Sequence, residues 1–145
     1  MTRRLLFVCT GNSARSQMAE AILNANANGK GRFAAASAGS RPAAQVNPYA
    51  LATLREFGIP WSGQPPRGLD GLQDEHWDYV ITVCDRAKES CPIFPGQPHL
   101  AHWSLPDPAE VEGDDATKRA AFRASFLEIR SRIDLLLALE SLIVK

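Results

Sequence analysis

The most apolar stretches of the chain are two short runs that each lead directly into a cysteine. Residues 5–8 precede Cys9, and residues 79–83 precede Cys84. Continuous apolar runs of this length are typical of strands that are buried on both faces of a sheet. Two weaker strand candidates are residues 33–38 and 100–103. The pattern therefore predicts four strands.

Between these runs, apolar residues recur at steps of three and four, as they do on one face of a helix. A first helix is predicted from Ser16 onward, and a second to begin with Asn47 as its N-cap and Pro48 at its first position. The last helix is predicted to start at Asp114 or Asp115. Its expected core face consists of Phe122, Phe126, Ile129, Ile133, Leu136 and Leu137.

Strands and helices thus alternate along the 145 residues. Such alternation is typical of α/β proteins. It predicts an open parallel four-stranded sheet flanked by helices on both faces, in a single domain that covers residues 1–145.

The composition narrows the classes of function. Sixteen Lys and Arg balance sixteen Asp and Glu, whereas binders of nucleic acid or anionic membranes usually carry a basic excess. No apolar stretch is long enough to span a bilayer, and the N-terminal run is too short for a signal peptide. We therefore expect a cytoplasmic protein with no nucleic-acid or membrane partner. In that compartment, the three cysteines are expected to do chemistry rather than to form structural disulfides.

The segment that joins the first predicted strand to the first predicted helix has the composition of an anion-binding loop. It reads Cys9-Thr10-Gly11-Asn12-Ser13-Ala14-Arg15-Ser16. Gly11 and Asn12 tolerate unusual backbone angles, so successive N–H groups can point to one place at the positive end of the helix dipole. A tetrahedral oxyanion fits there, and Arg15 can bind two of its oxygen atoms. The expected oxyanion-binding residues are Thr10, Gly11, Asn12, Ser13, Ala14, Arg15 and Ser16.

The same loop is expected to make Cys9 a nucleophile. The positive field of the loop is predicted to lower the pKa of Cys9 and to produce a thiolate. Ser16 can donate a hydrogen bond to the sulfur, and the Asn12 amide can hold the loop in shape. The alternative is an inert buried cysteine beside a surface arginine.

The loop and its surroundings resemble the thioredoxin-coupled arsenate reductases, which share their fold and anion loop with low-molecular-weight protein tyrosine phosphatases. The resemblance covers nearly the whole chain. It rests on residues 8–20, Ser37-Ala38-Gly39, Val46-Asn47-Pro48, Thr82-Val83-Cys84, Cys91-Pro92 and residues 102–108.

The resemblance implies a reaction that passes through all three cysteines. Cys9 attacks arsenate held in the loop, and Asp107 acts as the general acid. Cys84 then attacks Cys9 and releases arsenite, and Cys91 takes over the disulfide, which thioredoxin reduces. Phosphate is expected to compete with arsenate, and no bound cofactor is expected. We also expect no metal, because His99 and His102 lack a nearby Cys or acidic partner.

Two features of the sequence favour a reductase over a phosphatase. Phosphatases of the resembled type usually follow the Asp-Pro pair with two tyrosines that hold an aryl substrate, whereas Ala109 and Glu110 stand there in this chain. Phosphatases also need neither Cys84 nor Cys91. Related reductases coupled to glutathione or mycothiol have different cysteine arrangements, which favours thioredoxin. Two alternatives stay open, a phosphatase of phosphate monoesters and a thiol-based redox sensor that only binds anions.

The spacing of the two later cysteines predicts a conformational change. If residues 84–90 form a helix, Cys84 and Cys91 lie about 10 Å apart along its axis. A disulfide requires α-carbons within roughly 7 Å. Oxidation is therefore predicted to unwind this segment.

Arg67 marks a departure from the resembled family. Members of that family often bind potassium beside the loop through residues that correspond to Asn12, Glu20 and Ser37. Arg67 stands where a fourth ligand, an Asp, is expected, so the sequence predicts that this site is lost. Two interpretations remain for the guanidinium group: it pairs with Glu20, or it lies in solvent.

Overall fold

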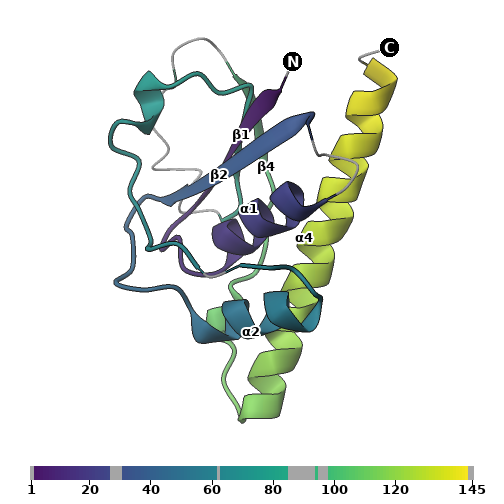
Figure 1. The fold of residues 1–145 in the computed structure, drawn as a ribbon. Coiled ribbons are helices and arrows are strands. Elements are labelled where there is room, and N and C mark those ends of the chain that lie inside the picture. The colour runs from purple at the N-terminus through teal and green to yellow at the C-terminus, as the bar shows by residue number, and fades with distance from the viewer. Residues whose placement is uncertain (1, 27–30, 62, 85–93, 95–97, 144–145) are drawn as a thin grey trace.

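A parallel four-stranded sheet forms the centre of the fold. The structure, a computed structural model, describes residues 2–26, 31–61, 63–84, 94 and 98–143. The strands follow the order β2-β1-β3-β4, and each neighbouring pair is parallel (Figure 1). They are β1 (Arg3–Cys9), β2 (Phe33–Gly39), β3 (Tyr79–Thr82) and β4 (His99–His102). The helices are α1 (Arg15–Ala25), α2 (Pro48–Glu56) and α4 (Asp115–Ile143), with the short 3-10 helices η1 (Leu72–Asp74) and η2 (Pro108–Glu110). The predicted sheet is therefore confirmed.

Helices α1 and α4 cover one face of this sheet. Successive side chains of a strand point to opposite faces, and Arg3 of β1 reaches Glu140 of α4 with 3.1 Å between Nη1 and Oε2. On the same face, Ser37 of β2 donates a hydrogen bond to Glu20 of α1. Figure 1 shows α1 lying in front of β1 and β2, with α4 running alongside.

The segment around η1 covers the opposite face. Arg4, the next residue of β1, places its guanidinium group 4.2 Å from the centre of the Trp77 ring. The Trp77 indole N–H donates to the backbone carbonyl of Leu72 in η1, and both side chains are buried. Both faces of β1 are therefore covered, which explains why residues 5–9 are all buried.

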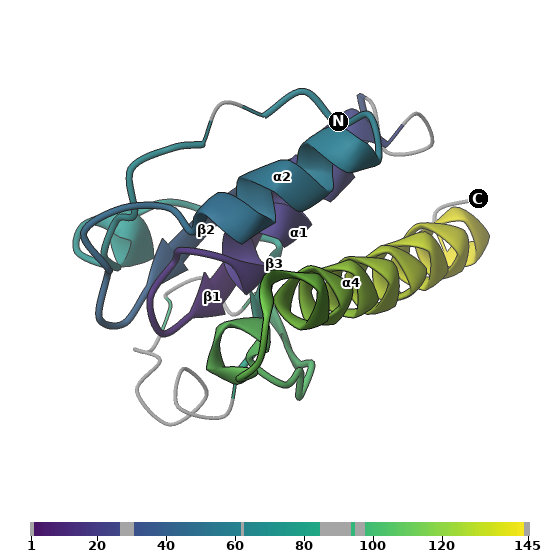
Figure 2. The ribbon, with the colours of Figure 1, turned by 90° about the horizontal axis from the view of Figure 1, so that it is seen from below.

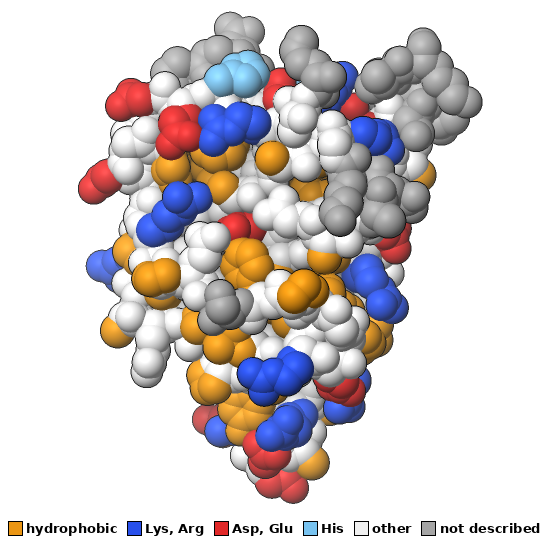
Figure 3. Space-filling view, viewed as in Figure 1, with side chains coloured by type: hydrophobic (Ala, Val, Ile, Leu, Met, Phe, Trp, Pro, Cys, Tyr) orange, Lys and Arg blue, Asp and Glu red, His pale blue; other side chains and the backbone are white. Residues whose placement is uncertain are grey.

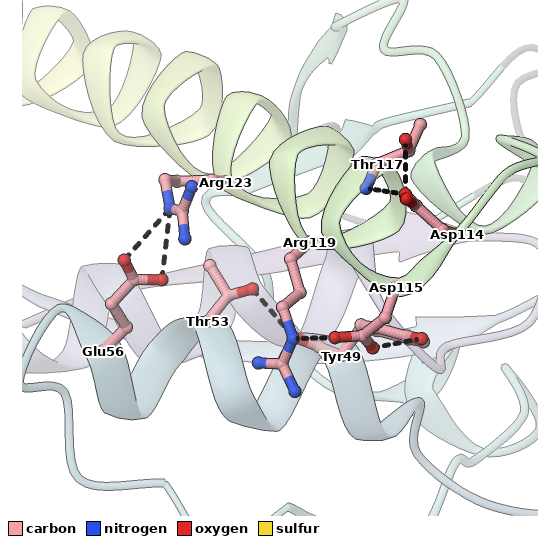
Figure 4. Close-up of polar contacts among 8 residues, drawn as sticks. All are labelled: Tyr49, Thr53, Glu56, Asp114, Asp115, Thr117, Arg119 and Arg123. Carbon is pink, nitrogen blue, oxygen red and sulfur yellow. Dashed lines mark hydrogen bonds and ion pairs between the residues drawn. The ribbon is translucent and has the colours of Figure 1, made fainter.

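The long helix α4 begins and packs as its sequence predicts. Asp114 is the N-cap, because its Oδ1 accepts hydrogen bonds from the backbone N–H and the hydroxyl group of Thr117 (Figure 4). The predicted core face is confirmed, although Leu136 is only partly buried. Its fully buried members are Phe122, Phe126, Ile129, Ile133 and Leu137.

Helix α2 joins the two larger helices, since it packs against both α1 and α4 (Figure 2). As predicted, its N-cap is Asn47, whose side chain accepts a hydrogen bond from the backbone N–H of Tyr49. The Tyr49 hydroxyl group donates to Asp115 at 2.8 Å, and Arg123 pairs with Glu56 (Figure 4). These contacts fix the first turns of α4 against α2.

The fourth strand differs from its prediction by one residue. It spans His99–His102 instead of residues 100–103, and the Leu100 side chain is 72% exposed. Because β4 is an edge strand, an apolar residue in it can be exposed to solvent, whereas the apolar residues of the central strand β1 are buried. Trp103 follows the strand and packs against Phe7, with 5.7 Å between ring centroids.

The surface agrees with the balanced composition. Basic and acidic side chains are interspersed on the face drawn in Figure 3. In the described part of the chain, no helix combines the length and the apolar character that a membrane span requires.

Candidate active site

The candidate site lies where the carboxyl ends of the strands meet. Cys9 ends the central strand β1, directly beside Gly39 at the end of β2, and Cys84 follows β3 closely. In open parallel sheets, ligands bind beyond the carboxyl ends of the strands. The binding crevice lies where the connections that leave two neighbouring strands go to opposite faces of the sheet. The strand order places β1 at this position.

Loop 10–14 links Cys9 to helix α1, and the start of that helix is open to an anion. Ala14 occupies the N-cap position without a side-chain hydrogen bond, and the first turn carries no acidic residue. The backbone N–H groups and the positive end of the helix dipole therefore remain available for an oxyanion.

The carbonyl groups of the loop are held by hydrogen bonds from a neighbouring segment. The backbone N–H groups of Ser40, Arg41, Ala43 and Asn47 donate to the carbonyls of Cys9, Thr10, Gly11 and Ser13, respectively. None of the donor residues lines the cavity in front of the loop. With its carbonyls bound in this way, the loop can present N–H groups to the cavity. A side chain at Gly39 would prevent this packing, because its Cβ would lie 2.5 Å from the Thr10 carbonyl oxygen.

Cys9 is surrounded by hydrogen-bond donors but is deeply buried. Its sulfur accepts a hydrogen bond from the backbone N–H of Asn12 at 3.1 Å and lies 2.8 Å from the Ser16 hydroxyl group. Asn12 has a φ of 51°, as expected for a residue that tolerates this conformation.

The lowered pKa expected for Cys9 is wrong. Burial raises the pKa of the thiol, whereas the hydrogen bonds from Ser16 and Asn12 and the charge of Arg15 lower it without cancelling the effect. Cys9 is only 2% exposed. The sequence reveals the donors of the loop, but it does not reveal this degree of desolvation.

Arg15 and Asp107 lie together on the wall of a cavity of about 490 Å³. The guanidinium group donates to the carbonyl of Leu105 at 2.7 Å, and its second nitrogen lies 3.5 Å from Asp107 Oδ2. Asp107 also caps η2, because its Oδ1 accepts from the backbone N–H of Ala109. The lining residues are Cys9, Thr10, Gly11, Ser13, Ala14, Arg15, Cys84, Leu105, Pro106, Asp107, Ala109 and Glu110.

This cavity brings together most of the residues singled out from the sequence. Cys9, Arg15, Cys84 and Asp107 all line it, although they come from three separate parts of the chain. Asn12 and Ser16, expected to bind the oxyanion, lie behind the loop instead and are almost fully buried. Ala109 and Glu110 line the part of the cavity wall where a phosphatase of the resembled type is expected to carry two tyrosines.

Cys84 is a free, buried thiol on this wall. Its sulfur lies 3.1 Å from the hydroxyl group of Thr10. Cys91, and with it the predicted unwinding of residues 84–92, falls outside the described residues.

A buried polar chain supports the loop from behind. The Asn12 side-chain N–H groups donate to the hydroxyl groups of Ser16 and Ser37, and Ser37 donates to Glu20 at 2.6 Å. The backbone N–H of Arg67 donates to the Asn12 side-chain oxygen, which fixes the orientation of the amide group. Burial raises the pKa of Glu20, and the Ser37 hydrogen bond and the Arg67 charge oppose this change.

The guanidinium group of Arg67 neither pairs directly with Glu20 nor lies free in solvent, the two positions that the sequence left open. Its Nε donates to the backbone carbonyl of Ser37 at 2.9 Å, so the group is not free in solvent. Its charge acts on Glu20, but the direct partner of that carboxylate is the Ser37 hydroxyl group.

Gln17 is a site residue that sequence reasoning missed. It lies in the first turn of α1 and is only 1% exposed. Its Nε2 donates to the carbonyls of Asn12 and Gln64, and its Oε1 accepts from Trp61 and from the backbone N–H of Gln64. A polar residue between buried positions of the first helix is the signal that could have drawn attention to it.

The two histidines of β4 do not form a joint metal site. Their side chains leave the strand on opposite faces, because they are three residues apart. His99 packs against Tyr79, and His102 Nδ1 lies 2.7 Å from the Thr82 hydroxyl group. Within the described ranges, no group of three or more His, Cys, Asp or Glu side chains is placed to hold a metal ion.

Comparison with known proteins gives the family. The model of the low molecular weight phosphotyrosine protein phosphatases matches residues 4–143. An arsenate reductase of Halalkalibacterium halodurans is 39% identical over 129 residues, which are 89% of this chain and 91% of that protein.

Solved structures give the same result. The thioredoxin-dependent arsenate reductase of Corynebacterium glutamicum has a TM-score of 0.74 and 32% identity, over 97% of this chain and 63% of that one. An arsenate reductase in its phosphate-binding state also has a TM-score of 0.74, with 30% identity over 94% of this chain and 98% of the other. The chain therefore belongs to the low molecular weight phosphotyrosine protein phosphatase family, and within that family it groups with the arsenate reductases.

Proposed function

We propose that this protein reduces arsenate to arsenite and is regenerated by thioredoxin. The observation that carries the proposal is the second thiol in the oxyanion cavity, because Cys84 lines the same wall as Cys9. Hydrolysis of a phosphate ester needs one nucleophilic thiol, whereas reduction needs a second thiol to supply electrons. The names of the relatives point the same way.

In the first step, Cys9 displaces one oxygen of arsenate. The thiolate attacks arsenic, an As–O bond breaks, and Asp107 gives a proton to the departing oxygen, which leaves as water. Arg15 and the loop N–H groups stabilise the charge on the remaining oxygens. Support for the acid role of Asp107 comes from its position beside Arg15 on the cavity wall.

In the second step, arsenic is reduced. The Cys84 thiolate attacks the Cys9 sulfur, the S–As bond breaks, and its electron pair stays on arsenic, which changes from As(V) to As(III). Arsenite leaves, and a Cys9–Cys84 disulfide remains. The 3.1 Å contact between the Thr10 hydroxyl group and the Cys84 sulfur supports this step, because Thr10 directly follows Cys9 in the chain.

In the last steps, the disulfide moves and is reduced. Cys91 attacks the Cys84 sulfur and frees Cys9, and the resulting Cys84–Cys91 disulfide accepts two electrons from the dithiol of thioredoxin. We propose that residues 84–92 unwind when this disulfide forms, and that the reaction takes place in the cytoplasm, where thiols are kept reduced. Amide exchange of this segment in both redox states tests the unwinding, and equal protection would contradict it.

Phosphate is expected to occupy the same loop without being reduced. It has nearly the same shape and charge as arsenate, and a relative has been solved in a phosphate-binding state. A phosphocysteine cannot accept the electron pair that the second step delivers. Phosphate should therefore raise the apparent KM for arsenate and leave kcat unchanged.

A coupled assay tests the proposal. Arsenate, thioredoxin, thioredoxin reductase and NADPH are mixed with the protein, and NADPH consumption is followed by absorbance. A parallel reaction contains glutaredoxin and glutathione, and another measures hydrolysis of an aryl phosphate. Arsenate-dependent NADPH consumption with thioredoxin supports the proposal, whereas aryl phosphate hydrolysis without arsenate reduction would replace it with a phosphatase.

A further inference from the structure

Five successive carbonyl groups of the anion loop, those of residues 9–13, are hydrogen-bonded from behind. Four of them accept from backbone N–H groups of residues 40–47. The fifth, the carbonyl of Asn12, accepts a hydrogen bond from a side chain, the Nε2 of Gln17, at 2.9 Å. The anion loop therefore depends on Gln17 at the one position where the neighbouring backbone segment does not supply the donor.

The conformation of Asn12 also affects the donors to Cys9. Its φ of 51° turns its backbone N–H onto the Cys9 sulfur. Its side-chain N–H donates to Ser16 Oγ, so the hydroxyl hydrogen of Ser16 is left to point at the same sulfur. A rotation at Asn12 would thus disturb two donors to Cys9 together.

Gln17 can hold Asn12 because its own position is fully determined. A side-chain amide has two N–H donors and an oxygen with two lone pairs, and all four are used. Apart from the bond to Asn12, the three others go to Trp61 and to both backbone groups of Gln64. The amide therefore joins Trp61 and Gln64 to the back of the anion loop.

We propose that Gln17 is a positioning residue for the oxyanion and for Cys9. It holds the left-handed backbone of Asn12 against the loop that contains Trp61, so that the N–H groups of the anion loop face the cavity before a ligand arrives. The inference rests on the proposed oxyanion site, and it does not depend on the reduction of arsenate.

The test replaces Gln17 with Met, which has a similar length and suits a helix but cannot form these hydrogen bonds. Inorganic phosphate binding is measured by calorimetry. The reaction of Cys9 with iodoacetamide is followed as a function of pH by mass spectrometry of the Cys9 peptide. We expect about tenfold weaker phosphate binding, which equals about 1.4 kcal/mol, and a higher midpoint for the alkylation of Cys9.

Asn24→Met is the matched control. Asn24 lies on the same helix, and its amide also makes two hydrogen bonds to a neighbouring backbone, that of Ala35. Its loss should lower stability without changing phosphate affinity or the pH profile of Cys9. Trp61→Phe removes only one of the four bonds of Gln17 and should change both quantities in the same direction as Gln17→Met, but less.

The outcomes separate this inference from the proposed function. Equal phosphate affinity and equal Cys9 profiles in Gln17→Met and the wild type would overturn it, as would an equal loss in Asn24→Met. If Gln17→Met does not fold, the same two measurements on Trp61→Phe test the inference, and values equal to those of the wild type would overturn it. Failure of the wild type to bind phosphate at all would instead contradict the proposed oxyanion site.

Discussion

The hydroxyl group of Thr10 lies 3.1 Å from the sulfur of Cys84, although the two residues are 74 positions apart in the chain. The contact joins the residue after the first thiol to the second thiol. It gives the anion loop a direct influence on the sulfur that is proposed to attack Cys9.

Replacing Thr10 with Val should therefore slow the second step and leave the first intact. The contact holds the Cys84 sulfur beside the residue that follows Cys9. Loss of one such hydrogen bond costs about 1.4 kcal/mol, or about a tenfold lower rate of Cys9–Cys84 disulfide formation. Phosphate affinity should change by less than about threefold (about 0.7 kcal/mol). Rapid-quench thiol counting during a single turnover measures the step, and Thr10→Ser, which keeps the hydroxyl group, should retain the wild-type rate. An unchanged rate in Thr10→Val would show that the contact plays no part.

Asp107→Asn should lower turnover by about 100-fold, because the amide cannot donate the proton that the departing oxygen needs. Arsenate reduction under saturating thioredoxin measures the effect. Glu112→Gln, a charge change on an exposed residue outside the cavity, serves as the control. Turnover of Asp107→Asn close to that of the wild type would assign Asp107 to the capping of η2 alone.

The reactivity of Cys9 should rise with pH through a midpoint above that of an ordinary cysteine, because burial raises the pKa of its thiol. The rate of alkylation of the Cys9 peptide, compared with N-acetylcysteine under the same conditions, gives the midpoint. Ser16→Ala should move it further up, since a donor to the sulfur is lost. A midpoint below that of the free amino acid would mean that the donors of the loop outweigh desolvation.

Glu20→Gln should change how stability depends on pH. Burial raises the pKa of Glu20 in the folded protein, so the folded state binds this proton more tightly than the unfolded state does. The stabilisation is complete below the ordinary glutamate pKa and is lost as pH rises through the folded value. The neutral isostere should therefore become progressively more stable relative to the wild type as pH rises through this range. Urea unfolding at a series of pH values that begins below the ordinary glutamate pKa and ends near neutrality measures the difference in free energy of unfolding, and a constant difference would contradict the prediction.

The sequence predicts the local elements well because periodicity and capping are local properties. The runs before Cys9 and Cys84 form β1 and β3, although β3 ends at Thr82, one residue before its predicted end. The Asn47 cap of α2 and the Asp114 cap of α4 are where the pattern places them. The edge strand is displaced by one residue, since Leu100 is exposed there and its apolar character does not report packing.

The parts of the site that the sequence does not predict depend on contacts between distant segments. The pairing of Gln17 with Trp61 and Gln64 requires the docking of a loop that has no periodic pattern. The raised pKa of Cys9 depends on how completely the folded chain buries the thiol. In contrast, the joint position of Cys9, Arg15, Cys84 and Asp107 could be anticipated, because each follows or precedes an element whose end lies at the same edge of the sheet.

The most direct test of the central claim is a single turnover of the fully reduced protein with arsenate and no reductant. The proposed reaction predicts about one arsenite per protein molecule. It also predicts a Cys84–Cys91 disulfide in the wild type and a Cys9–Cys84 disulfide in Cys91→Ser, both identified by mass spectrometry of peptides. Arsenite release without either disulfide, or a protein that keeps all its thiols reduced in the presence of arsenate, would contradict the account.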